Sequence, residues 1–243
     1  IGYGGDAAWD PITQKFMWAG SDHIDGNLAE GTRFIIYDAL SNTWINKPAP
    51  PWSSPGNSDH GYYNQAGNPS TGEFFRRGGK SSHVMYKYTP STDIWTALPP
   101  NNLLQYDFIC CSDITYFPEV GGLVQSQADG VFLFSNSTQQ WTQLAGILSG
   151  VGNTFALGTN NPVYKVMVLG DTGGFYKLDS SKQVTRLPNA PVTFYDGGGW
   201  LGNITADPIS GKYIVLSATS RQFYTYDVST GVWQQMANPS VPI

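Results

Sequence analysis

The residues of this chain that could do chemistry are histidines, carboxylates and aromatic side chains in segments rich in turn-forming residues. The candidate binding residues are His23, Asp25, Asp59, His60, Tyr62, Tyr63, His83, Tyr106, Asp107, Tyr195, Asp196 and Trp200. Tyr and Trp rings offer a large contact area at a low entropic cost, and carboxylates accept hydrogen bonds from hydroxyl groups. This set of residues therefore fits a glycan or a peptide ligand.

Two other interpretations of these residues stay open. His, Asp and Tyr side chains in loops can simply be solvated or cap turns. Asp22, His23 and Asp25 could also hold a divalent cation, although their spacing matches no recognised ligand motif. We therefore predict no cofactor and no metal, and we assign no catalytic residue.

Signatures of catalysis are sparse in the sequence. It contains no nucleophile elbow, phosphate-binding loop, zinc-protease helix motif or paired CxxC. A glycosidase needs two carboxylates that flank the scissile bond, and nothing in the sequence pairs two of the acidic residues near the predicted inner strands, which are Asp6, Asp107, Asp113 and Asp196. A carbohydrate-active enzyme, either an oxidase or a glycoside hydrolase, stays the alternative to a binding protein.

The composition restricts the class of partner. Charged residues make up 13% of the 243 residues, and the formal net charge is −5. Nucleic-acid binding is not expected because such proteins carry a basic patch, and the longest apolar runs are too short to insert into a bilayer. The low charge favours an extracellular location or the surface of a larger assembly. The chain begins at Ile1 without a signal-peptide pattern, so we expect a processed or trimmed N-terminus.

A repeat that ends in tryptophan organises the chain and must position these residues. In four copies a Trp follows the last aromatic residue of a β-rich run by seven positions, in the pairs Tyr37 and Trp44, Tyr88 and Trp95, Phe134 and Trp141, and Tyr226 and Trp233. A degenerate copy has Leu178 as the anchor, with Thr185 at the Trp position. We interpret the repeated aromatic residues as packing between neighbouring units, not as a ligand site.

A proline-led turn and a second β-rich run precede each copy. The turns begin at Asp10-Pro11, Asn68-Pro69, Phe117-Pro118, Asn161-Pro162 and Asp207-Pro208. Asp or Asn before Pro, followed by Ser or Thr and Gly, is typical of turns, because proline presets φ and glycine permits a positive φ. Each repeat therefore predicts four strands: A before this turn, B after it, C along the aromatic run and D with the Trp.

Four strands in each repeat of 44 to 51 residues predict an all-β fold, a five-bladed β-propeller of four-stranded antiparallel blades. We expect one domain over 1–243, with blades at approximately 1–50, 51–100, 101–147, 148–190 and 191–243. The alternative is that these five blades are a portion of a larger propeller.

These features resemble the kelch-repeat and galactose-oxidase-type β-propeller superfamily, of which the chain looks like a divergent member. The resemblance rests on Arg77-Gly78-Gly79 at the end of strand B, on Tyr37-Asp38 and Tyr226-Asp227, and on the four tryptophans. It implies the propeller fold. The copper site of galactose oxidase is not implied, because the three histidines are dispersed and the two cysteines, Cys110 and Cys111, lie in a predicted inner strand.

A propeller of this kind sorts its loops into two groups. The A–B and C–D connections are short turns, whereas the B–C and D–A loops are long and share the other end of each blade. Long loops on a rigid scaffold commonly carry function, and the candidate binding residues all map there. We therefore expect a non-enzymatic, kelch-like binding or structural module that presents its long-loop face to a protein or glycan partner.

Overall fold

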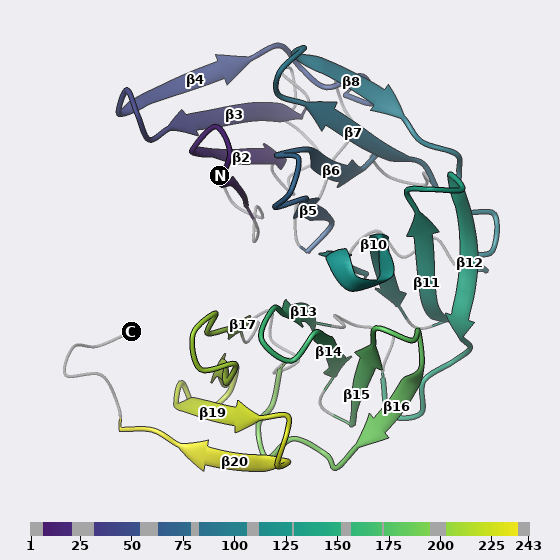
Figure 1. Cartoon of the computed structure of the whole chain (residues 1–243), viewed down its shortest axis with the longest axis vertical. Coiled ribbons are helices and arrows are strands. Elements are labelled where there is room, and N and C mark those ends of the chain that lie inside the picture. Colours follow the sequence, from purple (N-terminus) through teal and green to yellow (C-terminus); the bar gives the residue numbers. More distant parts are fainter. Residues whose placement is uncertain are drawn as a thin grey trace. The chain divides into compact units, whose positions relative to one another are not determined.

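The structure is a computed structural model that describes residues 7–20, 32–53, 63–78, 83–105, 112–127, 129–151, 157–171, 173–194 and 203–237. The strands form five four-stranded sheets, which we call blades 1 to 5 in chain order (Figure 1). Their strands are Ala8–Asp10 (β1), Lys15–Gly20 (β2), Arg33–Asp38 (β3) and Thr43–Lys47 (β4) in blade 1; Gln65–Gly67 (β5), Phe74–Arg77 (β6), Met85–Thr89 (β7) and Ile94–Ala97 (β8) in blade 2; Asp113–Phe117 (β9), Gly122–Gln127 (β10), Gly130–Ser135 (β11) and Gln140–Ala145 (β12) in blade 3; Leu157–Asn161 (β13), Val166–Asp171 (β14), Gly174–Asp179 (β15) and Val184–Leu187 (β16) in blade 4; and Asn203–Ala206 (β17), Tyr213–Leu216 (β18), Phe223–Asp227 (β19) and Val232–Gln235 (β20) in blade 5. A short 3₁₀ turn, Pro118–Val120 (η1), joins β9 to β10.

The strands of every blade lie side by side in chain order (Figure 1). This order confirms the predicted succession of strands A, B, C and D in all five repeats, and with it the all-β fold of a five-bladed β-propeller. The contacts within the chain divide it into two compact units, which are described separately. Unit 1 comprises Ile1–Cys110 with Phe134–Trp141, and unit 2 comprises Cys111–Leu133 with Thr142–Ile243.

The turns between strands A and B are closed by their own side chains. In four blades a side-chain oxygen of the residue before proline accepts a hydrogen bond from the backbone N–H two positions later, as Asp10, Asn68, Asn161 and Asp207 do. Blade 3 has Phe117 at this position and instead reverses through η1, which ends at Gly121 with φ of 72°. The predicted proline-led turns between strands A and B are therefore confirmed, and the side-chain hydrogen bonds that close four of them keep these connections short.

The tryptophan pattern follows the register of strands C and D. Tyr37 pairs with Trp44, Tyr88 with Trp95, and Tyr226 with Trp233. In blade 4 the prediction is wrong by one residue.

The cross-strand partner of Leu178 is Val184, and Thr185 pairs with Lys177. Val184 is half-buried and packs on the hydrophobic core, whereas Thr185 is exposed. The physical reason is a tighter reversal of the chain: five residues separate the paired Leu178 and Val184, whereas six separate Tyr37 and Trp44, so the inward position arrives after six residues instead of seven.

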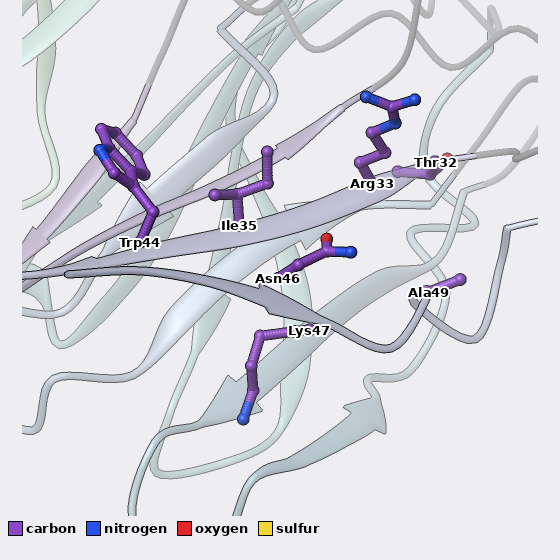
Figure 2. Close-up of a pocket in the computed structure, with 7 residues that line it drawn as sticks. All are labelled: Thr32, Arg33, Ile35, Trp44, Asn46, Lys47 and Ala49. Atoms are coloured by element: carbon purple, nitrogen blue, oxygen red, sulfur yellow. The ribbon is translucent and has the colours of Figure 1, made fainter.

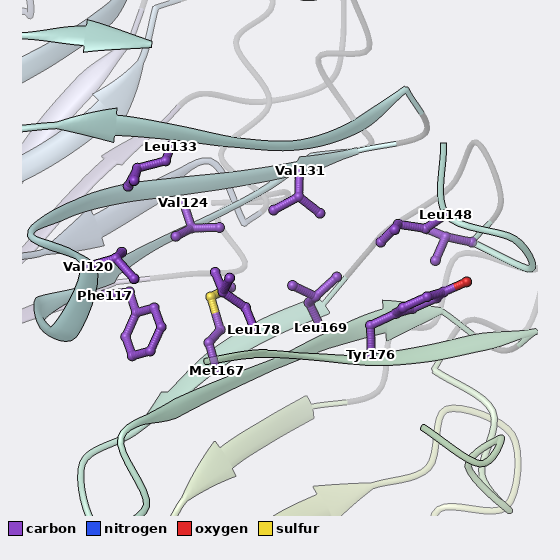
Figure 3. Packing of buried hydrophobic residues seen from close by; sticks show 11 residues of the cluster. Phe117, Val120, Val124, Val131, Leu133, Leu148, Met167, Leu169, Tyr176 and Leu178 are labelled. Carbon is purple, nitrogen blue, oxygen red and sulfur yellow. The ribbon is translucent and has the colours of Figure 1, made fainter. Parts of the chain in front are cut away.

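The blades pack through apolar residues of strands B and C. In unit 1, Met17, Ala19, Phe34 and Ile36 of blade 1 pack with Phe74 and Tyr88 of blade 2. In unit 2, one cluster joins blades 3 and 4 through Val124, Leu133, Met167, Leu169 and Leu178, all buried (Figure 3). Burial of such side chains contributes roughly 1.5–3 kcal/mol each, which makes these clusters the main source of stability.

Candidate functional site

The structure describes two of the predicted binding residues, Tyr63 and His83. The others lie outside the described residues, and their assignment stays a prediction: His23, Asp25, Asp59, His60, Tyr62, Tyr106, Asp107, Tyr195, Asp196 and Trp200.

Tyr63 and His83 come from different loops but lie at the same end of blade 2. Tyr63 closely precedes β5 and His83 closely precedes β7, and both side chains are half-buried. Strands β5 and β7 run in the same direction because each is antiparallel to β6. The structure therefore brings a D–A loop and a B–C loop together at one end, as the loop sorting predicted.

Backbone hydrogen bonds tie these two loops to the sheet. Arg77 N donates to Asn64 O at 3.0 Å, and Asn101 N donates to His83 O at 2.9 Å. Asn64 and Asn101 are both buried. The bases of both loops are thus continuous with the rigid sheet, which is the arrangement that positions binding residues precisely.

Two consecutive arginines, Arg76 and Arg77, are buried at this end of blade 2, each only 1% exposed. Arg76 Nε donates to Ala19 O of blade 1 at 3.2 Å, and Gln65 Oε1 accepts a hydrogen bond from Ala19 N at 3.2 Å. Charged side chains are almost never fully buried without partners. The guanidinium of Arg76 therefore joins blades 1 and 2 beneath the long loops.

Arg77 belongs to the run that resembles the kelch pattern, whereas no sequence pattern pointed to Arg76. The available signal was the run Phe74-Phe75-Arg76-Arg77, in which two arginines end an otherwise apolar strand. In β6 all four residues are buried. Alternation predicts burial of only one face of a strand, so it did not predict that both arginines are buried.

A row of aromatic side chains crosses one face of blade 1. Trp9 pairs with Phe16, Phe16 with Tyr37, and Tyr37 with Trp44, so that one residue of each strand lies in the row. Trp9 is 40% exposed, Phe16 44% and Trp44 73%. We call these four residues the aromatic row. The prediction that the repeated aromatic residues pack between neighbouring blades is confirmed for Trp95, whose ring lies 5.0 Å from that of Phe34 in blade 1.

A shallow groove of about 860 Å³ lies beside the aromatic row and is lined by Thr32, Arg33, Ile35, Trp44, Asn46, Lys47 and Ala49. Figure 2 shows the side chains of Arg33, Ile35 and Trp44 on the same side of the β3–β4 ribbon and Lys47 directed to the opposite side. The groove thus combines an exposed indole with amide and guanidinium groups at its margin.

Lys47 instead belongs to a charged link between blades 1 and 2. Its Nζ lies 2.7 Å from Asp93 Oδ2, and Tyr88 Oη donates to Asp93 Oδ1 at 2.6 Å. The hydrogen bond from Lys47, followed by that from Tyr88, holds the pKa of Asp93 below its ordinary value. Burial, followed by the hydrogen bond to Asp93, raises the pKa of Tyr88.

Among the residues that the structure describes, no group of three or more His, Cys, Asp or Glu side chains is arranged to hold a metal ion. No helix within the described ranges is long and apolar enough to span a membrane. No family model matches the chain, and no curated protein matches it. Membership of the kelch superfamily therefore stays a prediction that rests on the repeat residues.

Proposed function

We propose that this protein is a non-enzymatic, kelch-like binding module whose long-loop face contacts a protein or glycan partner. The observation that carries the proposal is the convergence of Tyr63 and His83, from two different loops, on one rigid end of blade 2. The other end of each blade is closed by short turns and offers few adaptable side chains. Binding residues are commonly found on loops that a rigid scaffold positions.

The chemistry of the predicted loop residues supports this function. Tyr and Trp rings stack on sugars or on apolar peptide side chains, while Asp and His side chains bond hydroxyl and amide groups. An extracellular setting, or one on the surface of a larger assembly, is part of the proposal because only 13% of the residues are charged.

Alanine substitution of three loop tyrosines tests the face directly. We expect the combined variant Tyr62→Ala, Tyr106→Ala and Tyr195→Ala to lose binding on a glycan array, or binding to a purified partner. Tyr164→Ala is the matched control, because Tyr164 lies in the β13–β14 turn at the opposite end of blade 4 and is 38% exposed. Unchanged binding by the triple variant would refute the proposed face.

Metal analysis of the purified protein separates this proposal from the enzyme alternative. Copper or zinc at one equivalent per chain, lost together with the histidines His23 and His60, would favour a catalytic site over a binding face. Substoichiometric metal that is unaffected by those substitutions is the result expected for a binding module.

A further inference from the structure

An exposed arginine stands at the end of blade 4 that contributes to the long-loop face. Arg186 lies near the end of β16, the strand that leads into the D–A loop, and it pairs across strands with Tyr176 of β15. Two other segments reach the same place: residues 146–151, which follow blade 3, and residues 172–173, which connect β14 to β15. All of them belong to unit 2.

Three contacts within unit 2 hold the guanidinium group of Arg186 in place. Its Nη2 donates to Gly173 O at 3.2 Å and to Asn189 Oδ1 at 3.1 Å. Its central carbon lies 5.9 Å from the centre of the Tyr176 ring, which is within the range of a cation–π contact. The ring is itself fixed, because Tyr176 is buried and its Oη donates to Ser149 O at 2.7 Å. Arg186 is therefore exposed but ordered.

Two nitrogen atoms of this guanidinium group stay available to a ligand. An arginine side chain carries five N–H donors, and the hydrogen bonds of Arg186 with described residues use only those of Nη2. Within the part of the chain that the structure describes, Arg186 forms no ion pair. The donors on Nε and Nη1 can therefore bond an anionic group, and hydrogen bonds between charged partners are about twice as strong as neutral ones.

A large apolar side chain is exposed on the adjoining segment. Ile147 is 74% exposed, whereas the next residue, Leu148, belongs to the hydrophobic core of unit 2 (Figure 3). Ile147 stands two positions before Ser149, the residue that accepts the hydrogen bond from Tyr176. Neighbouring blades of a propeller meet through the faces of their sheets and leave the loop ends uncovered. A fixed cation and an exposed aliphatic side chain thus share this end of unit 2.

We propose that Arg186 and Ile147 form a docking site for a partner protein that presents an acidic residue next to an apolar one. The acidic side chain accepts hydrogen bonds from Nε or Nη1 of Arg186, and the apolar side chain packs on Ile147. The inference rests on the proposed binding function of the long-loop face and gives the partner a chemical class. Arginine is enriched among the residues that dominate binding energy, and a side chain that is already ordered loses little entropy on binding.

The pair of side chains favours a protein over an acidic sugar as the occupant. The carboxylate of a sugar acid would satisfy Arg186 but would bring hydroxyl groups onto Ile147, where they lose hydrogen bonds to water. A peptide segment presents an acidic and an aliphatic side chain on one face, at alternate positions of a strand or one turn apart in a helix. The formal net charge of −5 repels acidic partners at long range, so recognition depends on the local contact with Arg186.

Selection of peptides on the immobilised full chain tests the site. From a phage-displayed library of random peptides we expect enrichment of sequences with Asp or Glu close to Leu, Ile, Val or Phe. Fluorescence anisotropy with the enriched peptides should show affinity reduced about tenfold or more by Arg186→Gln, and also reduced by Ile147→Ser. The matched controls are Lys182→Gln and Ile209→Ser, because both residues are exposed in turns at the opposite end of their blades. Neither control should change the affinity.

Three results would overturn the docking site: no enriched peptide, enriched peptides without acidic residues, or equal affinity of wild type and Arg186→Gln for the enriched peptides. Acidic glycans that bind on an array through Arg186 but independently of Ile147 would assign the site to a sugar and overturn it as well. Circular dichroism confirms that each variant is folded.

The triple tyrosine variant distinguishes failure of this inference from failure of the proposed function. Peptide binding that survives in that variant but is lost in Arg186→Gln supports the docking site and refutes the role of the three tyrosines. Binding that is lost in the triple variant but kept in Arg186→Gln refutes the docking site alone.

Discussion

Tyr226 of blade 5 occupies the strand position of Tyr37 in blade 1 and of Tyr88 in blade 2, whose hydroxyl groups each donate a hydrogen bond to a residue of the following turn. Tyr37 Oη donates to Asn42 Oδ1 at 2.7 Å, and Tyr88 Oη donates to Asp93 Oδ1 at 2.6 Å. Both acceptors occupy the left-handed position of the C–D turn, and in blade 5 that position is Gly231, with φ of 73°. Tyr226 Oη is buried and has no partner among the described residues.

Replacing Gly231 with Asn should therefore stabilise the protein. A buried hydroxyl group without a partner costs about 1–3 kcal/mol. Asn tolerates the left-handed conformation better than other residues with a side chain, and the strain of about 1 kcal/mol is partly offset by the smaller entropy of the unfolded chain. A Cβ atom at position 231 meets nothing within 4 Å, so the new side chain has room. We expect a net gain of about 1 kcal/mol.

The assay is urea-induced unfolding of the wild type and the variants. A shift of the midpoint urea concentration reports a change in stability when the dependence of the unfolding free energy on urea concentration is unchanged. Gly231→Ala carries the same backbone strain without an acceptor and should be destabilising by about 1 kcal/mol. In a Tyr226→Phe background the gain from Gly231→Asn should vanish, because no hydroxyl group is left to satisfy. A gain that persists in that background would refute the reasoning, as would a Gly231→Asn protein no more stable than Gly231→Ala.

Two further predictions concern the contacts between strands and blades. Asp93, whose pKa is lowered chiefly by Lys47 and then by Tyr88, contributes stability above its unfolded pKa of about 3.9 and loses it as the pH falls through the lower folded pKa. In the Asp93→Asn variant this loss of stability below about pH 4 should disappear, while the side-chain oxygen at position 93 still accepts the hydrogen bond from Tyr88. If the free energy of unfolding of the variant falls at low pH as it does in the wild type, the contribution of the Lys47–Asp93 contact is refuted. Val184→Ala should destabilise the protein by about 0.5–2 kcal/mol, whereas Thr185→Ala should change stability by less than about 0.5 kcal/mol. Equal effects in thermal unfolding would contradict the register of blade 4.

The five repeats, their four strands and their turns could all be predicted from the sequence. Asp and Asn before proline, and a residue at positive φ in the C–D turn, act within a few positions of the chain. The spacing of Tyr37 and Trp44 likewise reflects a local register across one hairpin. These features can be predicted because each depends on residues that are close to one another in the sequence.

Only the general position of the proposed binding face, at the long-loop end of the blades, could be predicted from the sequence. The sequence sorts the loops to one end, and the structure confirms that Tyr63 and His83 lie at the same end of blade 2. The arginine pair beneath them was not foreseen, because the burial of Arg76 depends on the backbone of Ala19, 57 positions away. A strand pattern does not tell whether both of its faces are covered.

The sequence by itself determined the strand order, the turn geometry and the repeat that defines the fold. Only the tertiary structure decided that Val184 takes the inward position in blade 4, that Trp95 is packed on Phe34, and that Arg76 is buried against the backbone of Ala19. The physical reason is that hairpin geometry is set by backbone conformation and hydrogen bonds within one blade. Burial is instead set by the surface that a second blade brings to it.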